Sequence, residues 1–462
     1  MYSCSGVETI NSDKPRVILL GGGLAGLRCA QQLVTEHGLS TENIVLLEAS
    51  TRIGGRIRTD KSFIEGFSLD LGAELLHGDQ TSLYRLAEEK GWKMEELISL
   101  AQGDGGPLPA DSNDGYANTV GAALEDTSLA GTCYVEHEWD VDGDRTFVLQ
   151  GSLGQVVDEL SAGLESCIQT DWPVSKVEFT ASGLATVTCR DGRIEQGTHV
   201  VSALPLSVLQ DGDVEFVPPL PEAKLAAFQH MGLCSIVKVI LKFDRRVLPP
   251  LLHGCICSES FIPEFWFRHL PNLPEGGYTM LAVGFAAGPR ADAVTSVKPK
   301  EALKKALDQL DDMFRGRKWL EGGGCTGKGD WEETVEVHTG IAPEHCEPRR
   351  ETSVSGGQGE GTLAELPSSA YVGGLVHDWV KDEPFVRGGY CYPRIGFDET
   401  THAHLAASVN GTLFFAGEHT NTPTGTTVHA AIDSGDRAAS GVLQAVQRAQ
   451  KERASGTAAQ IP

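Results

Sequence analysis

The 462-residue sequence predicts an α/β protein with two interleaved domains. Three observations predict this class. Residues 17–59 follow the order strand, glycine turn, helix and second strand. Short strand patterns between 174 and 204 are separated by glycine turns, and residues 412–448 repeat the order strand, glycine and helix. We therefore expect one sheet assembled from distant segments, with a second domain between them.

The first strand and its turn have the pattern of a phosphate-binding unit. Val17–Leu20 is a continuous apolar run, as expected for a parallel strand covered on both faces. Gly21 permits the tight turn, Gly23 lets a phosphate approach the backbone, and Gly26 lets the helix pack close to the strand. The N-terminus of this helix carries free N–H groups and a partial positive charge, which favour phosphate.

The second strand and the turn after it narrow the ligand class. Ile44–Leu47 ends at Glu48, which lies 22 residues after Gly26, close to the spacing at which an acid meets a ribose hydroxyl. Arg52-x-Gly54-Gly55-Arg56 then offers a second approach to a pyrophosphate. NAD enzymes of this fold do not need that turn, so we expect a Rossmann-type FAD-binding domain. An α/β turn without any nucleotide is the alternative.

Composition and charge limit the partners. The formal net charge is −25, from 38 basic and 63 acidic residues. Such a field repels nucleic acid and favours small cationic molecules, although it also simply promotes solubility. No apolar run approaches the ~18 to 20 residues that span a bilayer. We expect no nucleic-acid partner and no membrane span; the oligomeric state stays open, with a monomer favoured.

The ends of the chain and the cysteines bear on the compartment. Residues 1–14 are polar without a leader pattern, and the C-terminal Gln460-Ile461-Pro462 is no peroxisomal address. The eleven cysteines are scattered and include no CxxC pair, so we expect them to be reduced thiols. We find no spacing of cysteines and histidines that is typical of a metal site. We expect a cytoplasmic protein without a metal; a peroxisomal location stays open.

The chain divides into segments of two kinds. The nucleotide-binding domain is expected at 16–80, 146–207 and 408–450, and an α+β substrate domain built on a mixed sheet at 81–145 and 208–407. We also expect irregular structure over 100–145, a flexible loop at 320–368, and tails at 1–14 and 451–462.

One lysine stands in an apolar strand. In Ser235–Phe243 the period of two places Ile236, Lys238 and Ile240 on one face. A lysine in an apolar row is costly unless it finds a partner. A site residue and a snorkelling lysine on an edge strand are both open at this point.

Several segments together resemble a known family. They occur in the family's order and comprise Gly21–Thr59, Leu69–Gly78, Val200–Pro205, Lys238, Arg387–Tyr390 and Phe415–Thr420. The chain resembles the flavin-containing amine oxidases, a superfamily of monoamine oxidases, polyamine oxidases and lysine-specific histone demethylases. The Leu-Gly-Ala-x-x-x-His-Gly segment and Thr427-Val428-His429 are most similar to the polyamine and spermine oxidase branch.

The resemblance implies which residues hold FAD. The ADP part would meet Gly21, Gly23, Leu24, Ala25, Gly26, Glu48, Arg52, Gly55 and Arg56, with adenine near Val174. Leu71, Gly72 and Ala73 would line the isoalloxazine, and Gly417, Glu418, Thr427 and Val428 would hold the ribityl chain and pyrimidine edge. A helix starting near Thr427 would point its partial positive charge at flavin N1, where negative charge gathers on reduction.

The resemblance also implies catalytic and substrate-binding residues. Lys238 would hold a water against flavin N5 and assist the oxygen step, and Tyr390 would form one wall of an aromatic cage. Thr427 would stand at the opposite wall, and His77 near the substrate path. Gly389 replaces the cysteine that carries covalent flavin in monoamine oxidases, so FAD should be bound non-covalently.

The expected function is FAD-dependent oxidation of a cationic amine, with a polyamine as the expected substrate and oxygen reduced to hydrogen peroxide. Two alternatives stay open. One is a flavin oxidase for another amine or an amino acid, which an arginine at the flavin face would favour. The other is an FAD-binding protein without turnover, because the segment between Gly78 and Thr146, where the family has a helical roof, is short and polar.

Overall fold

A computed structural model describes most of the chain. The described residues are 15–97, 118–139, 142–143, 145–181, 183–248, 252–257, 260–270, 278–315, 318–319, 325–326, 335–339, 361–362, 365–421 and 425–455. The expected tail 1–14 and most of the expected loop 320–368 therefore lie outside the description.

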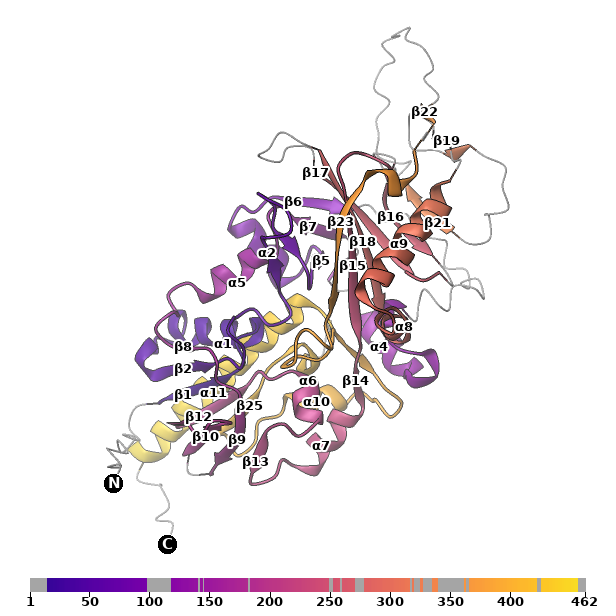
Figure 1. The fold of residues 1–462 in the computed structure, drawn as a ribbon. Helices are drawn as coiled ribbons and strands as arrows, with labels where there is room; N and C mark the ends of the chain where they lie inside the picture. The colour runs from indigo at the N-terminus through magenta and orange to yellow at the C-terminus, as the bar shows by residue number, and fades with distance from the viewer. Residues whose placement is uncertain are drawn as a thin grey trace, which may run out of the picture.

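A five-stranded parallel sheet joins segments from both ends of the chain (Figure 1). In spatial order its strands are β25 (Leu413–Phe415), β12 (His199–Ser202), β1 (Val17–Leu20), β2 (Ile44–Leu47) and β8 (Ile168–Gln169). Every residue of β1 and β2 is buried, because both faces of the sheet are covered.

Three helices cover one face of this sheet. They are α1 (Leu24–Thr35), α5 (Gly154–Ser161) and α11 (Val428–Ala454). Figure 1 shows α11 beside α1 along this layer, so the first and last helices are neighbours in space. Helix α11 also runs four residues into the stretch expected as a C-terminal tail.

A four-stranded sheet covers the opposite face and shares its hydrophobic core. Its order is β11 (Ile194–Gly197), β10 (Ala185–Cys189), β9 (Val174–Phe179) and β13 (Glu215–Val217). The expected strands at 174–179 and 185–190 are confirmed as a hairpin. Strand β11 was not predicted, since Ile194 is exposed and no apolar alternation marks the strand.

The second domain is built on a six-stranded sheet. In spatial order its strands are β21 (Val335–Thr339), β16 (Leu252–Cys257), β17 (Glu264–Leu270), β18 (Thr279–Ala287), β15 (Ile236–Phe243) and β23 (Tyr371–Asp378). All its described pairings are antiparallel, so the prediction of a mixed sheet was wrong in this detail. Strands joined by short connections, as β16, β17 and β18 are, can only pair antiparallel.

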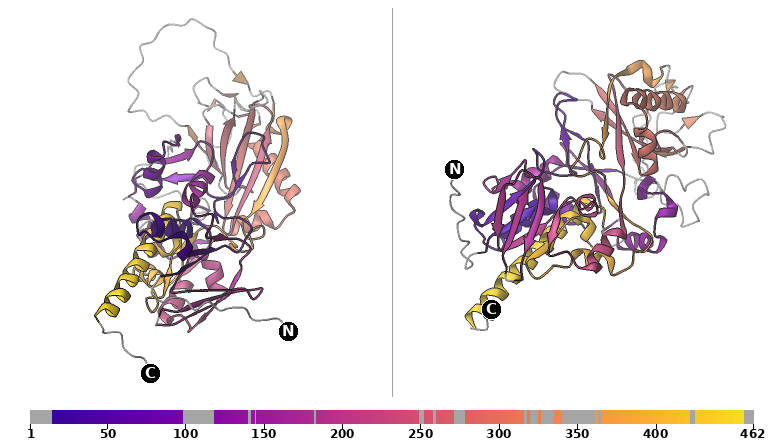
Figure 2. Two further views of the ribbon diagram at one scale, coloured as in Figure 1. Left: turned by 90° about the vertical axis from the view of Figure 1, so that its left-hand side faces the viewer. Right: turned by 60° about the horizontal axis from the view of Figure 1, so that its bottom comes forward.

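The two faces of this sheet have different partners. Helices α8 (Pro289–Thr295) and α9 (Pro299–Phe314) pack on one face around Val237, Val239 and Leu241. The other face carries Lys238 and Ile240 and meets the segment that follows β4 (Leu69–Asp70). Figure 2 shows the two domains side by side, with this sheet standing over the nucleotide-binding half.

Smaller elements connect the domains. The remaining strands are β3 (Thr59–Asp60), β5 (Leu75–His77), β6 (Met94–Leu97), β7 (Thr146–Leu149), β14 (Met231–Leu233), β19 (Lys318–Trp319), β20 (Cys325–Thr326), β22 (Gly361–Thr362) and β24 (Cys391–Pro393). The remaining helices are α2 (Ser82–Glu89), α4 (Leu129–Trp139), α6 (Leu206–Gln210), α7 (Glu222–Gln229) and α10 (Thr401–Ala406). Short 3₁₀ turns are η1 (Thr41–Asn43), η3 (Leu124–Asp126), η4 (Pro367–Ala370) and η5 (Glu418–Thr420).

The expectation of irregular structure over 100–145 was wrong for its described part. Helix α4 begins after Ser128, whose hydroxyl accepts from Gly131 N at 3.1 Å. A Cβ on Gly131 would lie 2.7 Å from Phe397, so the helix packs against its neighbour through a small residue. Such packing leaves no apolar stripe in the sequence, which is why the periodicity did not reveal this helix.

Among the residues that the structure describes, no helix is long and apolar enough to cross a membrane.

Candidate functional site

Two glycine turns face each other at the carboxyl end of β1. Gly54 N donates to Gly22 O at 2.8 Å, and Gly23 and Gly54 form a parallel bridge. A Cβ on Gly55 would lie 3.1 Å from Gly23 Cα, so a side chain there would crowd the facing turn. The two motifs, which we predicted to approach one phosphate group from two sides, are thus in contact.

The close strand–helix packing expected at Gly26 is also present. A Cβ at this position would lie 2.0 Å from Gly21 O. Leu24 and Ala25 form the buried first turn of α1 directly above the first glycine turn. No side chain caps this helix start, so its first N–H groups face outward from the turn, as a phosphate site requires.

Glu48 lies beneath the first turn, at the end of β2. Its Oε2 accepts from Gly22 N at 2.7 Å and its Oε1 from Ser50 N at 2.8 Å. The side chain is buried. Each carboxylate oxygen keeps a lone pair after these bonds, so Glu48 can brace the turn and still accept from a ribose hydroxyl.

The two arginines of the second turn are both held by carbonyls and acids. Arg52 donates to Gly55 O at 3.0 Å and to Glu383 Oε2 at 2.9 Å. Arg56 donates to Glu418 Oε1 at 2.7 Å. Burial alone would lower the pKa of Arg56, but the carboxylate of Glu418 raises it. The bond between Arg56 and Glu418 therefore connects the second glycine turn with the turn at Gly417, near the end of the chain.

Glu418 offers the clearest test of whether FAD fits. Burial would raise the pKa of its carboxyl, but the charge of Arg56 lowers it, so the group is ionised at neutral pH. Oε1 accepts from Arg56 and from Cys391 Sγ at 2.9 Å, whereas Oε2 is buried and has no partner in the part of the chain that the structure describes. An ionised oxygen in this state requires a donor, which a ribityl hydroxyl would supply. The residues fit the cofactor.

The start of α11 also agrees with the prediction. Thr427 caps the helix, because its Oγ1 accepts from Ala430 N at 3.1 Å. Gly417, at φ +129°, starts the turn that carries Glu418, and its N–H donates to Ser434 Oγ of the same helix at 2.8 Å. Val428 is the first residue of α11. Whether these residues touch FAD remains a prediction.

The segment expected to line the isoalloxazine has no room for side chains at its centre. A Cβ on Gly72 would lie 1.9 Å from Arg56 O. Trp379 Nε1 donates to Leu71 O at 2.9 Å, and Ala73 N donates to Arg56 O at 3.3 Å. This backbone is thereby fixed against the second glycine turn. Val174, expected near adenine, begins β9 and is buried in the core between the two sheets.

Lys238 is fully enclosed. Strand β15 lies between β18 and β23, so it is not an edge, and the Lys238 side chain is 3% exposed. The alternative of a snorkelling lysine was therefore wrong. Nζ donates to Asp70 O at 2.9 Å and to Glu74 Oε2 at 3.0 Å, which gives the buried charge its counter-ion.

Glu74 collects three donors. Besides Lys238, Trp266 Nε1 donates to Oε2 at 3.1 Å and Arg268 donates to Oε1 at 3.1 Å. Burial would raise the pKa of Glu74, but the charges of Lys238 and Arg268 lower it. The carboxylate is thus ionised and bound on both oxygens.

Tyr390 and a second acid meet at Asn118. The Tyr390 hydroxyl donates to Thr119 O at 2.7 Å and lies 3.3 Å from Asn118 O. Asn118 Nδ2 lies 3.5 Å from Glu264 Oε2, and its Oδ1 accepts from Ala287 N at 2.8 Å. Burial raises the pKa of Glu264 to about 7. Residues before α4 therefore lie over the tyrosine, where the sequence suggested a reduced roof.

His77 and Thr427 have structural contacts of their own. His77 Nδ1 lies 3.4 Å from Thr146 Oγ1, and burial together with the charge of His429 lowers its pKa to about 4. A neutral imidazole is therefore expected at physiological pH. The substrate contacts that we predicted for both residues stay predictions.

Cys391, Glu418 and His419 are grouped tightly enough to suggest a metal site, with ligand atoms within 4.8 Å of one another. Arg56 already places a cation on Glu418 at 2.7 Å. Burial lowers the pKa of His419 to about 4. We assign the group to the cofactor end of the site rather than to a metal.

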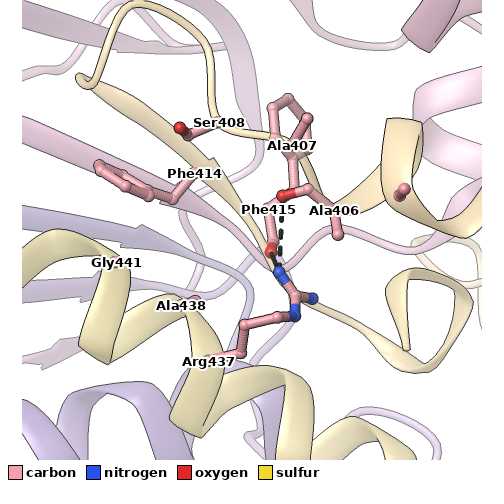
Figure 3. Close-up of a pocket in the computed structure, with 9 residues that line it drawn as sticks. Ala406, Ala407, Ser408, Phe414, Phe415, Arg437, Ala438 and Gly441 are labelled. Atoms are coloured by element: carbon pink, nitrogen blue, oxygen red, sulfur yellow. Dashed lines mark hydrogen bonds between the residues drawn. The ribbon is translucent and has the colours of Figure 1, made fainter. Parts of the chain in front are cut away.

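A pocket of about 270 Å³ lies between α10, β25 and α11, next to the turn that carries Glu418 (Figure 3). Its lining comes from α10, β25 and α11: Ala403, Ala406, Ala407, Ser408, Phe414, Phe415, Arg437, Ala438 and Gly441. Arg437 donates to Phe415 O at 3.2 Å and to Thr420 Oγ1 at 2.5 Å. The arginine thereby ties the turn that carries Glu418 to α11.

Sequence reasoning missed five residues around Lys238 and Tyr390: Glu74, Asn118, Glu264, Trp266 and Arg268. Three of them alternate along β17, from Glu264 to Arg268, on the face opposite Phe265 and Phe267. That period of two was a signal that could have been used. Glu74 directly follows the Leu-Gly-Ala segment, so the sequence already placed an acid where a buried position was expected.

The whole chain can be compared with known proteins. A family model described as flavin containing amine oxidoreductase matches residues 24–104, 110–338 and 359–443. Human lysine-specific histone demethylase 2 is 24% identical, over 92% of this chain and 53% of its own length. Polyamine oxidase 2 of Arabidopsis thaliana is 24% identical, over 94% of this chain and 89% of its own length. The chain thus spans about half the length of the human demethylase.

Solved structures show the same fold. Cyclohexylamine oxidase from Brevibacterium oxydans superposes with a TM-score of 0.68 at 16% identity, covering 94% of this chain and 99% of that chain. Putrescine oxidase superposes with a TM-score of 0.63 at 20% identity, covering 93% and 99%. The fold, the paired glycine turns and the match over most of the sequence lead to one conclusion: this chain belongs to the flavin-containing amine oxidoreductase family.

Proposed function

We propose that this protein is an FAD-dependent amine oxidase that acts on polyamines. The observation that carries the proposal is that Tyr390 and the half-buried carboxyl of Glu264 both contact Asn118, Tyr390 at its backbone carbonyl and Glu264 at its side-chain amide. No cation lies within ion-pair distance of Glu264 among the described residues. A cationic substrate with more than one ammonium group would complete this arrangement. The similarity to polyamine oxidase 2 over nearly all of that protein supports the same class.

The cofactor would be held without a covalent bond. Gly389 has no thiol, and a Cβ there would lie 1.9 Å from Ile236 Cδ1. Cys391 is the nearest following thiol; burial raises its pKa, and its Sγ already donates to Glu418. The glycine turns, Glu48, Arg56 and Glu418 would hold FAD, which supplies hydride acceptance and reaction with oxygen when bound.

The chain's own residues would orient the amine and exclude water. Tyr390 is fixed by its bond to Thr119 O, so its ring can only present one face to a substrate. Glu264 would accept from an ammonium group away from the reacting carbon. Lys238, held by Glu74, would place an N–H donor beside the oxygen reaction.

Oxidation of an amino acid is the second candidate. Arg268 is the observation that favours it, because the side chain lies on the same face as Lys238 and could meet a carboxylate. Its guanidinium, however, already donates to Glu74 at 3.1 Å. This occupied arginine makes the polyamine the better-supported substrate.

Anaerobic bleaching of bound flavin tests the proposal. Purified protein that shows flavin absorbance is mixed without oxygen with spermine, spermidine, an N-acetylated polyamine, a methylated-lysine histone peptide or an amino acid. We expect bleaching by polyamines. Bleaching by the peptide alone, or by the amino acid alone, would show that the substrate belongs to that class and not to the polyamines. Bound flavin that no amine bleaches would refute the proposal of an amine oxidase.

A matched variant tests the role of the acid. Glu264→Gln keeps the size and the bond to Asn118 but cannot ionise, so it is compared with wild type at pH 8, above the raised pKa of the acid. We expect KM for a diamine to rise about tenfold, with little change for a monoamine of equal chain length. An equal change for both amines would show that Glu264 does not recognise the second ammonium group.

A further inference from the structure

Glu74 and Lys238 form a buried ion pair, with Lys238 Nζ 3.0 Å from Glu74 Oε2. Both side chains are nearly excluded from solvent, at 8% and 3% exposure. Burying an ion pair is costly unless its remaining donors and acceptors are also satisfied. On the carboxylate side they are, because Trp266 and Arg268 also donate to the Glu74 oxygens.

Lys238 has one N–H donor more than it has acceptors among the described residues. An ammonium group has three N–H donors. One is taken by Glu74 Oε2 at 3.0 Å and one by Asp70 O at 2.9 Å. The structure records no third acceptor among the described residues. One donor direction is therefore left, and the two bonds fix where it points.

The environment of Glu74 fixes its position in turn. Trp266 Nε1 donates to the same oxygen as Lys238, and the indole ring lies 5.3 Å from Lys238 Nζ. Arg268 holds the other oxygen at 3.1 Å. The acid thus cannot rotate without losing bonds to two strands, β15 and β17.

We propose that Glu74 is a positioning residue for Lys238: it holds the lysine side chain in place and aims its one remaining N–H toward the flavin side. Glu74 itself need not touch substrate or cofactor. This inference rests on the proposed function in one respect: it takes from it that Lys238 assists the reaction of reduced flavin with oxygen.

The test compares four flavin-loaded proteins: wild type, Glu74→Gln, Lys238→Met and the double variant. Bound flavin is reduced with dithionite in the absence of oxygen, then mixed with oxygen, and recovery of the oxidised absorbance is timed. No amine is needed, so a failure of the proposed substrate class would not affect this measurement.

We expect Glu74→Gln to slow the oxygen reaction by about tenfold, the loss typical of a hydrogen bond to a charged group. The double variant should be no slower than Lys238→Met, because Glu74 acts only through the lysine. An oxygen reaction of wild-type speed in Glu74→Gln would refute the proposal. Independent slowing in the double variant would also refute it.

A readout without turnover checks the contact itself. In urea unfolding of the same four holoproteins, the combined loss of stability should be smaller than the sum of the single losses, as for residues in contact. Additive losses would show that the pair is not formed. Glu74→Asp, which keeps the charge with a shorter reach, should recover part of the oxygen reaction and serves if Glu74→Gln does not fold.

Asp70→Asn is the matched control. Its carboxyl is also buried and close to Lys238, but only its backbone carbonyl touches the lysine. Burial raises the pKa of this carboxyl to about 7, so the control is run at pH 8, where removing the charge should leave the oxygen reaction within a factor of about three of wild type. An effect as large as that of Glu74→Gln would mean that general charge, rather than the contact, governs the reaction.

Discussion

The glycine cradle at Gly21–Arg56 and the proposed catalytic face of this protein are built in different ways. The glycine cradle uses backbone groups and glycines that lie within about forty residues of one another, such as Gly23 and Gly54. The catalytic face uses side chains from distant segments, with Glu74 bonded to Lys238 and to Arg268. Backbone geometry is conveyed by short motifs, whereas the meeting of distant side chains is not. The predictions below test this difference.

The largest effect is expected in the cradle, from Gly26→Ala. The new Cβ would lie 2.0 Å from Gly21 O, so α1 must move away from β1. We expect loss of bound flavin and a stability loss of about 3 kcal/mol or more. Flavin absorbance per protein and urea unfolding measure both quantities.

Gly373→Ala is the control for this change, because a Cβ there would meet nothing within 4 Å. It should bind flavin normally. If Gly26→Ala also keeps its flavin, close strand–helix packing is not what the cradle requires.

On the catalytic face, Lys238→Met should retain FAD and slow the oxygen reaction by about 100-fold. The lysine contacts Asp70 O and Glu74 but no residue of the glycine turns, so the cradle should be unaffected. Stopped-flow mixing of reduced protein with oxygen measures the rate. If Lys238→Met lost its flavin and not its reactivity with oxygen, Lys238 would belong to the cradle and the two regions would not be separate.

Glu264 should make stability depend on pH. Burial raises the pKa of this carboxyl from 4.5 to about 7, so the folded state holds its proton more tightly than the unfolded state. The resulting stabilisation is complete below pH 4.5 and is lost as pH rises through 7, by up to about 3 kcal/mol. Urea unfolding from pH 4.5 to 8 should show this decline, and Glu264→Gln should reduce the slope. An unchanged slope would mean that Glu264 is solvated.

The smallest effect is expected at the start of α11. Thr427→Ala removes the cap on Ala430 N and should cost about 1 kcal/mol of stability. Thr427→Ser should retain the cap. Thermal unfolding compares the stability of the two variants. A parallel measurement of KM shows whether Thr427 also contacts the substrate; equal KM values for the Ala and Ser variants would contradict that contact.

Much of the cradle could be predicted because its rules are local. The apolar run of β1, the glycine spacing and Glu48 each follow from one short segment. The strand around Lys238 was also predicted, with the correct face. Helix α4 was missed because it packs against Phe397 through Gly131 rather than through an apolar stripe. The mixed sheet was wrong because the order of strands depends on pairing between segments far apart.

By itself, the sequence determined that this chain builds a dinucleotide cradle of the flavin amine oxidoreductase type. Glycine positions and apolar runs act through the backbone, over distances that a motif can span. Only the tertiary structure decided that Lys238 is paired with Glu74 and that Tyr390 meets Glu264 through Asn118. The physical reason is that a buried charge takes whichever partner the fold brings within about 3 Å, and no local rule specifies that partner.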